Sequence, residues 1–139
     1  MSRSTARAAA MQLIYARMVG GEGDDRALTE LIAPHPALDA DDERYIADIT
    51  EGVWRDRAEL DARIGAFARD WPVARMARVD LAILRLSAYE LANREDVPPA
   101  VSINEAVELT RAYSTEESGA FVNGILGSMH RARDRETAK

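Results

Sequence analysis

The chain has 139 residues, 47% of them hydrophobic, and a formal net charge of −6. This length suits a single domain, residues 1–139, that buries a core without disulfides or metals. Cysteine is absent, which excludes disulfides and thiolate metal sites. No apolar run approaches the ~20 residues of a bilayer-spanning helix, and the N-terminus lacks the order of a secretion signal. We therefore expect a cytoplasmic protein that does not associate with membranes, and its negative charge argues weakly against a general nucleic-acid binder.

The helices are predicted from apolar residues that recur at helical spacing, with no alternating strand pattern. Proline, glycine and capping residues set the ends of these helices. The predicted helices cover about residues 4–19, 25–33, 39–70 with a break possible near Arg57, and 79–93. Two capping-box patterns, Ser102-x-x-Glu105 and Ser114-x-x-Glu117, predict the starts of the last two helices. The fold class is all-α with six or seven helices, and the mixed-charge tail 131–139 is expected to fray.

The residue patterns that catalysis requires are missing from the sequence. The histidines are His35 and His130, and neither follows a glutamate at the spacing of a helical metal site. Glycine-rich phosphate loops and the Gly-x-Ser-x-Gly motif of hydrolases do not occur. Glu105 and Glu108 are better explained as a helix cap and a solvated face than as a catalytic pair. We therefore expect no catalytic residues, no metal and no cofactor.

The first helix carries a candidate RNA-binding strip. Arg3 and Arg7 lie one turn apart and share a face, which Gln12 and Tyr15 continue. Arginine suits phosphate contacts, and a tyrosine ring stacks on an unpaired base. The alternative is an ordinary solvated helix start with Tyr15 half in the core, and the residues alone favour that alternative. We expect residues 1–7 to form a short basic arm.

Further polar residues stand among apolar ones in the later helices. Arg85 either pairs with an acid such as Glu90 or extends its stem to the helix edge. Asp80 either interacts favourably with the helix dipole or is an exposed partner contact. Glycine costs about 1 kcal/mol relative to alanine inside a helix, a cost that close packing would explain. Asparagine side chains can bind a neighbouring backbone in the same setting. Three residues are expected to fix how helices cross, namely Asn104, Asn123 and Gly124.

Over almost its whole length, from Arg3 to Leu126, the chain resembles the NusB family of bacterial transcription antitermination factors. The order and spacing of several motifs carry this resemblance. They are Arg7…Gln12…Tyr15, Leu60-Asp61-x-x-Ile64, Val79-Asp-x-Ala-Ile-Leu-Arg-Leu-x-x-Tyr-Glu-Leu91, Val97-Pro98, Val101-Ser-Ile-Asn-Glu-Ala-Val-Glu-Leu109 and Ser118-x-x-Phe-Val-Asn-Gly-Ile-Leu126.

The resemblance implies two three-helix bundles packed across one another and a non-enzymatic function. Family members pair with NusE, a small-subunit ribosomal protein, bind the boxA element of nascent ribosomal RNA, and act with other Nus factors on RNA polymerase. Some form homodimers, so a monomer or a homodimer is expected. By position, Asp80 would contact NusE. The RNA surface would comprise Arg3, Arg7, Gln12, Tyr15, Tyr113, Glu117, Ser118 and Phe121.

The N-terminal arm departs from a well-known form of the family, which has several consecutive arginines before the first helix. Here the segment reads Ser2-Arg-Ser-Thr-Ala-Arg7. Fewer phosphate contacts predict weaker RNA binding with a shallower salt dependence, and leave more of the affinity to NusE. Two alternatives remain open. One is a protein-interaction module that no longer binds RNA, and the other is an accessory domain that serves a separate methyltransferase chain.

Overall fold

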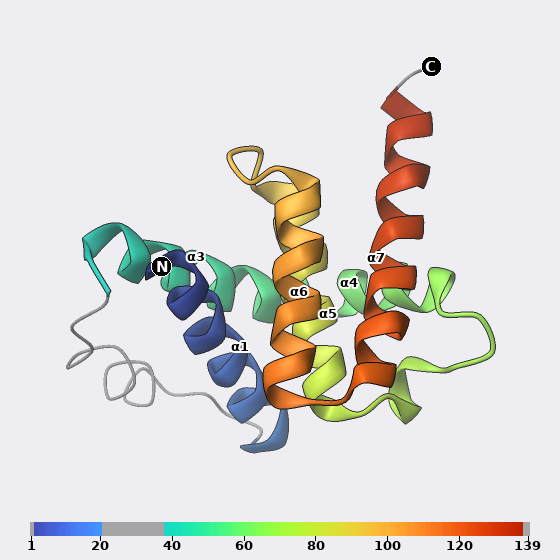
Figure 1. Ribbon diagram of the computed structural model, residues 1–139, viewed down its shortest axis with the longest axis horizontal. Coiled ribbons are helices and arrows are strands. Elements are labelled where there is room, and N and C mark those ends of the chain that lie inside the picture. The colour runs from blue at the N-terminus through green and yellow to red at the C-terminus, as the bar shows by residue number, and fades with distance from the viewer. Residues whose placement is uncertain (1, 21–37, 138–139) are drawn as a thin grey trace.

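The computed structural model describes residues 2–20 and 38–137 (Figure 1). In these ranges the chain is helical apart from its turns, so the predicted all-α class is confirmed. The elements are α1 (Ser2–Gly20), α3 (Ala40–Arg55), α4 (Arg57–Phe67), the 3-10 turn η1 (Val73–Arg75), α5 (Arg78–Asn93), α6 (Pro99–Tyr113) and α7 (Glu116–Thr137). The helix predicted over residues 25–33 lies outside the described residues.

The central helix is α5, because its apolar residues cover most of its circumference. Leu81, Ile83, Leu84 and Leu86 are all buried, and α5 contacts α1, α3, α4, α6 and α7. In Figure 1, α1 and α3 lie on one side of α5, α4 and α7 lie on the other, and α6 runs alongside it. No helix in the described part of the chain is long and apolar enough to cross a membrane.

The long helix predicted over residues 39–70 is divided into α3 and α4. A capping box starts α3, in which the carboxylates of Asp39 and Asp42 each accept a hydrogen bond from the other residue's amide. Asp56 separates α3 from α4, beside the break that the sequence indicated. Asp70 then adopts a left-handed conformation with a φ of 59° and turns the chain toward η1.

Both capping boxes predicted for the last two helices are wrong. Helix α6 begins one turn earlier, at Pro99, because the fixed φ of proline suits the first turn of a helix and its missing N–H is not needed there. Ser102 therefore lies inside the helix and is buried. At the start of α7 the Thr115 hydroxyl accepts from the Ser118 amide at 3.0 Å, which leaves Ser114 for another contact.

Neither end of the described chain forms the free segment that its charges predicted. Helix α1 begins at Ser2, so the expected basic arm is instead the first part of a helix. Helix α7 continues to Thr137, and the Arg133 guanidinium donates to the backbone carbonyl of Leu91 at the end of α5. Residues 131–137 of the tail predicted to fray are therefore helical, and Arg133 holds them to α5.

Asn104, Asn123 and Gly124 do not fix helix crossings, contrary to expectation. All three are exposed, and a methyl group on Gly124 would meet no atom within 4 Å. A close approach occurs instead at Gly52 of α3, where a methyl group would overlap the ring of Tyr89. A glycine inside a helix is compatible with either situation, which is why the sequence pattern did not separate them.

Candidate functional site

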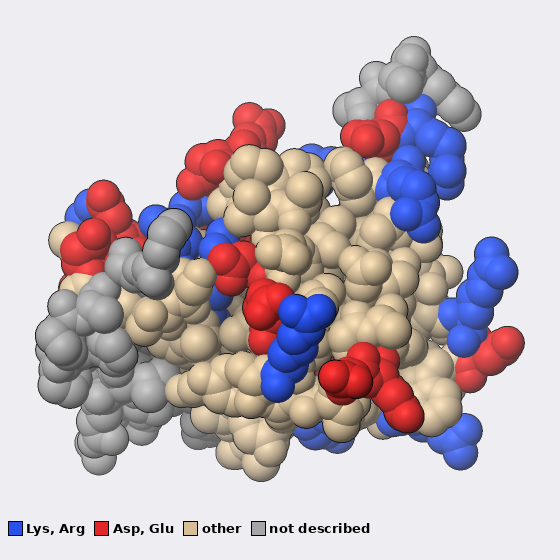
Figure 2. Space-filling model, in the orientation of Figure 1, with Lys and Arg blue, Asp and Glu red and all other residues tan. Residues whose placement is uncertain are grey.

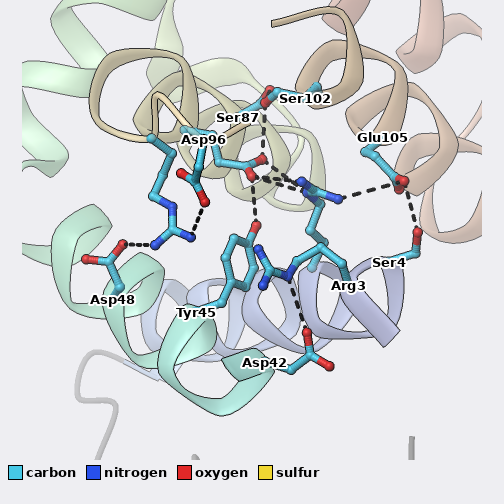
Figure 3. A network of polar contacts seen from close by, with 12 residues as sticks. Arg3, Ser4, Asp42, Tyr45, Asp48, Ser87, Asp96, Ser102 and Glu105 are labelled. Atoms are coloured by element: carbon cyan, nitrogen blue, oxygen red, sulfur yellow. Dashed lines mark hydrogen bonds and ion pairs between the residues drawn. The ribbon is translucent and has the colours of Figure 1, made fainter. Parts of the chain in front are cut away.

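Arg7, which was expected on the RNA surface, lies in the interior and is only 4% exposed. Its guanidinium donates to both carboxylate oxygens of Glu90 on α5 at 3.2–3.3 Å. The hydroxyls of Tyr45 and Ser102 donate to the same carboxylate at 3.0 and 3.1 Å (Figure 3). Glu90 is thus surrounded by donors from α1, α3 and α6, and this polar cluster holds those helices to the central one.

A second acid contributes to the charge balance of this cluster. Arg7 lies 3.8 Å from the carboxylate of Glu105 on α6, which also accepts from the Ser4 hydroxyl at 2.9 Å. Burial is the largest single effect and lowers the pKa of Arg7, but Glu90, Tyr45 and Glu105 together outweigh it and raise that pKa. Arg7 therefore stays charged and bound to the core, and it is not accessible as the RNA contact that the sequence predicted.

Two other arginines also tie helices together. The Arg3 Nε donates to Asp42 at 3.3 Å, and its guanidinium lies 4.5 Å from the centre of the Tyr45 ring. Its side chain is still 34% exposed, so part of the guanidinium remains accessible. Arg85 finds its acidic partner in Asp61 of α4, to which it donates at 2.6 and 2.7 Å.

Gln12 and Tyr113 are 101 positions apart in the sequence and meet at the surface. The side-chain amide of Gln12 on α1 donates to the Tyr113 hydroxyl at the end of α6 at 2.9 Å. Tyr113 is 44% exposed, and Tyr15, one turn along α1 from Gln12, is 37% exposed. These three residues form what we call the tyrosine edge, where the C-terminal ends of α1 and α6 come together (Figure 1).

Asp80, the expected partner contact, is 6% exposed and fixes the turn between α6 and α7. One carboxylate oxygen accepts from the Ser114 hydroxyl at 2.8 Å, and the other accepts from the Ser118 hydroxyl at 2.7 Å. Because its two oxygens accept these bonds, the buried carboxylate of Asp80 joins the start of α5 to the start of α7. It thereby positions residues 117–121 on the first turns of α7.

A groove of about 480 Å³ opens beside Asp80, and we call it the Trp71 groove. Three of the residues predicted to bind RNA line it together with Asp80, namely Glu117, Ser118 and Phe121. The remaining lining residues, apart from Asp80, are Arg69, Trp71, Met76, Ala77 and Thr115. Trp71 was not among the residues predicted from the sequence to form a site. An indole in a turn with arginines on both sides was the signal that could have identified it.

Comparison with known proteins decides which family this arrangement belongs to. The NusB family model matches residues 4–131 of the chain. The chain belongs to the NusB family. Over 129 residues it is 42% identical to the transcription antitermination protein NusB of Acetivibrio thermocellus, covering 93% of this chain and 88% of that relative. NusB proteins are antitermination factors and not enzymes.

Solved NusB structures have the same fold. The structure of T. maritima NusB matches with a TM-score of 0.85 and 29% identity, covering 93% of this chain and 90% of that one. A crystal structure of the antitermination factors NusB and NusE in complex with dsRNA matches with a TM-score of 0.84 and 25% identity, covering 94% of this chain and 97% of that one. The tyrosine edge and the Trp71 groove therefore lie within the shared NusB fold.

Apart from Arg3 and Arg7, the residues predicted to bind RNA lie in two neighbouring places. The tyrosine edge is one, and the start of α7 with the Trp71 groove is the other. The segment from Tyr113 to Ser118 connects them, and its serines are held by Asp80. No group of three or more histidine, aspartate and glutamate side chains in the described ranges could hold a metal ion. The arrangement offers aromatic rings and hydrogen-bonding groups, which are the components of a binding surface.

Proposed function

We propose that this chain is an RNA-binding adaptor that pairs with NusE and binds boxA of nascent ribosomal RNA. Together with other Nus factors and RNA polymerase, the pair would suppress termination in the cytoplasm, where nascent RNA is made. The observation that carries the proposal is the Gln12–Tyr113 hydrogen bond, because it joins α1 and α6 into one exposed edge. The relative crystallised with NusE and dsRNA gives further support.

The proposed RNA surface combines the tyrosine edge with the start of α7. Tyr15 and Tyr113 expose rings on which unpaired bases can stack, and each such contact contributes about 1–3 kcal/mol. Phe121 adds a third ring beside the groove, and Glu117 accepts hydrogen bonds from base amino groups. Arg3 supplies a partly exposed cation roughly 18 Å further along α1, twelve residues from Tyr15. Gln12 and Ser118 complete this surface as hydrogen-bonding groups.

The NusE contact is proposed at the junction of α5 and α7. Asp80 lines the Trp71 groove there, but the hydroxyls of Ser114 and Ser118 occupy its carboxylate. Because Asp80 is 6% exposed, we expect it to act through the shape of the junction rather than through direct contact between its carboxylate and NusE.

A titration of labelled boxA RNA tests the proposal. The RNA is mixed with this chain, with NusE, and with both proteins together. The ternary complex is expected to be stronger than either binary complex. If adding NusE does not increase the amount of RNA that this chain retains, the adaptor function is contradicted.

Tyr113→Ala tests the tyrosine edge within the same titration. We expect RNA binding about tenfold weaker, because the variant loses a stacking ring and the acceptor of Gln12. Val101→Ala is the matched control, since Val101 is 42% exposed at the opposite end of the same helix. Equal RNA affinities for the two variants would exclude the tyrosine edge from the RNA surface.

The burial of Arg7 favours a second candidate function, a NusE-binding module that does not itself hold RNA. Helix α1 offers fewer accessible cations than its sequence suggested, because Arg7 is bound to Glu90. Both candidates bind NusE, so calorimetry with NusE in the absence of RNA is read together with the boxA titration to separate them. In the second case NusE binding persists, while the pair retains boxA RNA no better than NusE alone.

A further inference from the structure

A groove of about 690 Å³ runs between α6 and α7, and we call it the α6–α7 groove. Figure 1 shows the two helices side by side and running in opposite directions, joined by a short turn. In Figure 2 the surface over these helices is mostly uncharged, and basic side chains stand near both of its ends. The groove belongs neither to the tyrosine edge nor to the Trp71 groove, which is lined by a different face of α7.

Two exposed asparagines line the groove from opposite walls, Asn104 on α6 and Asn123 on α7. Asn104 lies about 14 Å along α6 from Tyr113, where that helix ends. Asn123 lies about 11 Å along α7 from Glu116, where that helix begins. Because a short turn joins these two helix ends, the asparagines stand at nearly the same height across the groove.

Neither of these side-chain amides has a hydrogen-bond partner in the described part of the chain. Asn93, by contrast, donates to the carbonyl of Tyr89 at 3.2 Å. An asparagine side chain has an N–H donor beside a carbonyl acceptor, and it can bind the edge of a base through both groups. The two free amides can therefore hold one planar base between the walls of the groove.

Small residues leave room for a base ring around Asn123. Ala120 and Gly127 lie about one turn before and after it on the same face of α7, and both line the groove. At the lower end, α6 and α7 approach closely, since a methyl group on Gly119 would lie 3.1 Å from the Thr110 hydroxyl. The groove is therefore closed at this part of its floor and open beside the asparagine.

An arginine lies on each side of the two amides. The guanidinium of Arg131 lies beside Gly127, where an added methyl group would be 3.2 Å from its nitrogen, so it is about one turn from Asn123. Arg111 lies about 10 Å along α6 from Asn104. Arg111 pairs with Glu108, but both side chains are more than half exposed and solvent weakens such a pair.

We infer that the α6–α7 groove binds single-stranded RNA that flanks boxA. One unpaired base enters between Asn104 and Asn123, and Arg111 and Arg131 bind adjoining phosphates. The inference rests on the proposed function, because the strand enters the groove from the tyrosine edge and the start of α7. Arg111 provides the continuity, since it lines the groove and lies two residues before Tyr113.

The charges of the groove favour RNA over an acidic or neutral protein segment. Glu116 is the only acid among its described lining residues, against the two arginines. Glu116 lies at the lower end of the groove, where it can accept a hydrogen bond from the amino group of a base. Arginine binds phosphate through several N–H groups, and the amides between the arginines suit base edges.

Three fluorescent RNAs test the base contact in titrations with this chain and NusE. The first is boxA alone, and the second is boxA extended by several nucleotides at both ends. The third has the same length as the second but carries abasic residues in place of the added nucleotides. We expect the native chain to bind the extended RNA about tenfold more tightly than boxA alone. The abasic extension should lose most of that gain, because it keeps the phosphates but offers the amides no base.

The double variant N104A/N123A should bind boxA alone as the native chain does but gain little from the extension. Alanine is a better helix former than asparagine, so the variant is expected to fold, and circular dichroism checks that it does. Asn93→Ala is the control, because Asn93 is an exposed asparagine at the end of α5, outside the groove. It should keep the tenfold gain.

Arg131→Gln and Arg135→Gln form a matched pair for testing the phosphate contact. Each removes an exposed arginine from α7, one inside the groove and one about a turn beyond it. The extended RNA is titrated with each variant and NusE over a range of salt. We expect Arg131→Gln to lower the slope of log affinity against log salt by about 0.7. Arg135→Gln should leave the slope unchanged.

The results separate this inference from the proposed function. If the native chain with NusE binds boxA but gains nothing from the extension, or if N104A/N123A gains as much, the inference is refuted and the function stands. An abasic extension that keeps the full gain refutes the base contact. If the native chain retains no RNA, both are refuted. If N104A/N123A weakens binding to NusE in the absence of RNA, the groove is a protein contact, which also overturns the inference.

Discussion

Arg7 and Glu90 form an ion pair in the interior, where their side chains are 4% and 0% exposed. Removing one partner of such a pair leaves a buried charge without compensation. We expect Arg7→Ala to lower the free energy of unfolding by about 3–5 kcal/mol, measured by urea denaturation. Arg44→Ala is the control, because Arg44 pairs with Asp41 where both side chains are more than two-thirds exposed. A surface pair of this kind contributes about 0–1 kcal/mol, so equal losses in the two variants would contradict the argument.

The sequence predicted the helix that carries Arg7 but not the direction of its side chain. The partner of Arg7 is Glu90, which is 83 positions away, and no local pattern connects the two residues. Arg85 shows the same limit, since its partner Asp61 lies on another helix. Residue types alone therefore overestimated the exposed positive charge of α1.

Two glycines inside helices, one crowded and one open to solvent, predict opposite effects of alanine on stability. Gly52 of α3 faces the ring of Tyr89, whereas Gly124 of α7 faces open space. Gly52→Ala is expected to lower the free energy of unfolding by about 1–3 kcal/mol through overpacking. Gly124→Ala is expected to raise it by up to about 1 kcal/mol, because alanine is the better helix former. Urea denaturation measures both changes, and a shift in the same direction for both would refute this account.

The helices themselves were largely predictable, because their periodicity and end signals are local. The helices predicted over residues 4–19 and 79–93 match α1 and α5 to within two residues at each end. The cap predictions failed where a stronger contact competed. Pro99 starts α6 ahead of Ser102, and Asp80 binds the hydroxyl of Ser114. A serine pattern thus predicts a cap only when no tertiary partner takes the hydroxyl.

Because α5 contacts helices on both of its sides, the described part of the molecule is expected to unfold cooperatively. The guanidinium groups of Arg17 and Arg57 lie over the ring of Trp54 on α3, at 4.3 and 4.1 Å from its centre. The fluorescence of Trp71 reports on the turn between α4 and α5, on the other side of α5. The Trp71→Phe variant keeps only the fluorescence of Trp54, and Trp54→Phe keeps only that of Trp71. For each variant, the urea concentration at the midpoint of the fluorescence change should equal the midpoint measured by circular dichroism. A tryptophan signal that changes well before the helix signal would show that the two sides unfold separately.

At the scale of the whole molecule, the sequence indicated the fold class and the family but not the shape of the surface. The all-α class follows from periodicity, and the order of the motifs matched the NusB family. The Trp71 groove could not be predicted in this way, because its walls come from the α4–α5 corner and from α7. Its residues meet only after α5 has brought those segments together.

The Gln12–Tyr113 hydrogen bond joins the first helix to the end of α6. During synthesis Gln12 leaves the ribosome long before Tyr113 has been added to the chain. The tyrosine edge is therefore absent from every nascent chain that stops short of Tyr113, however well its early helices have formed. Under the proposed function, an unfinished copy still attached to its ribosome cannot compete with finished copies for boxA RNA.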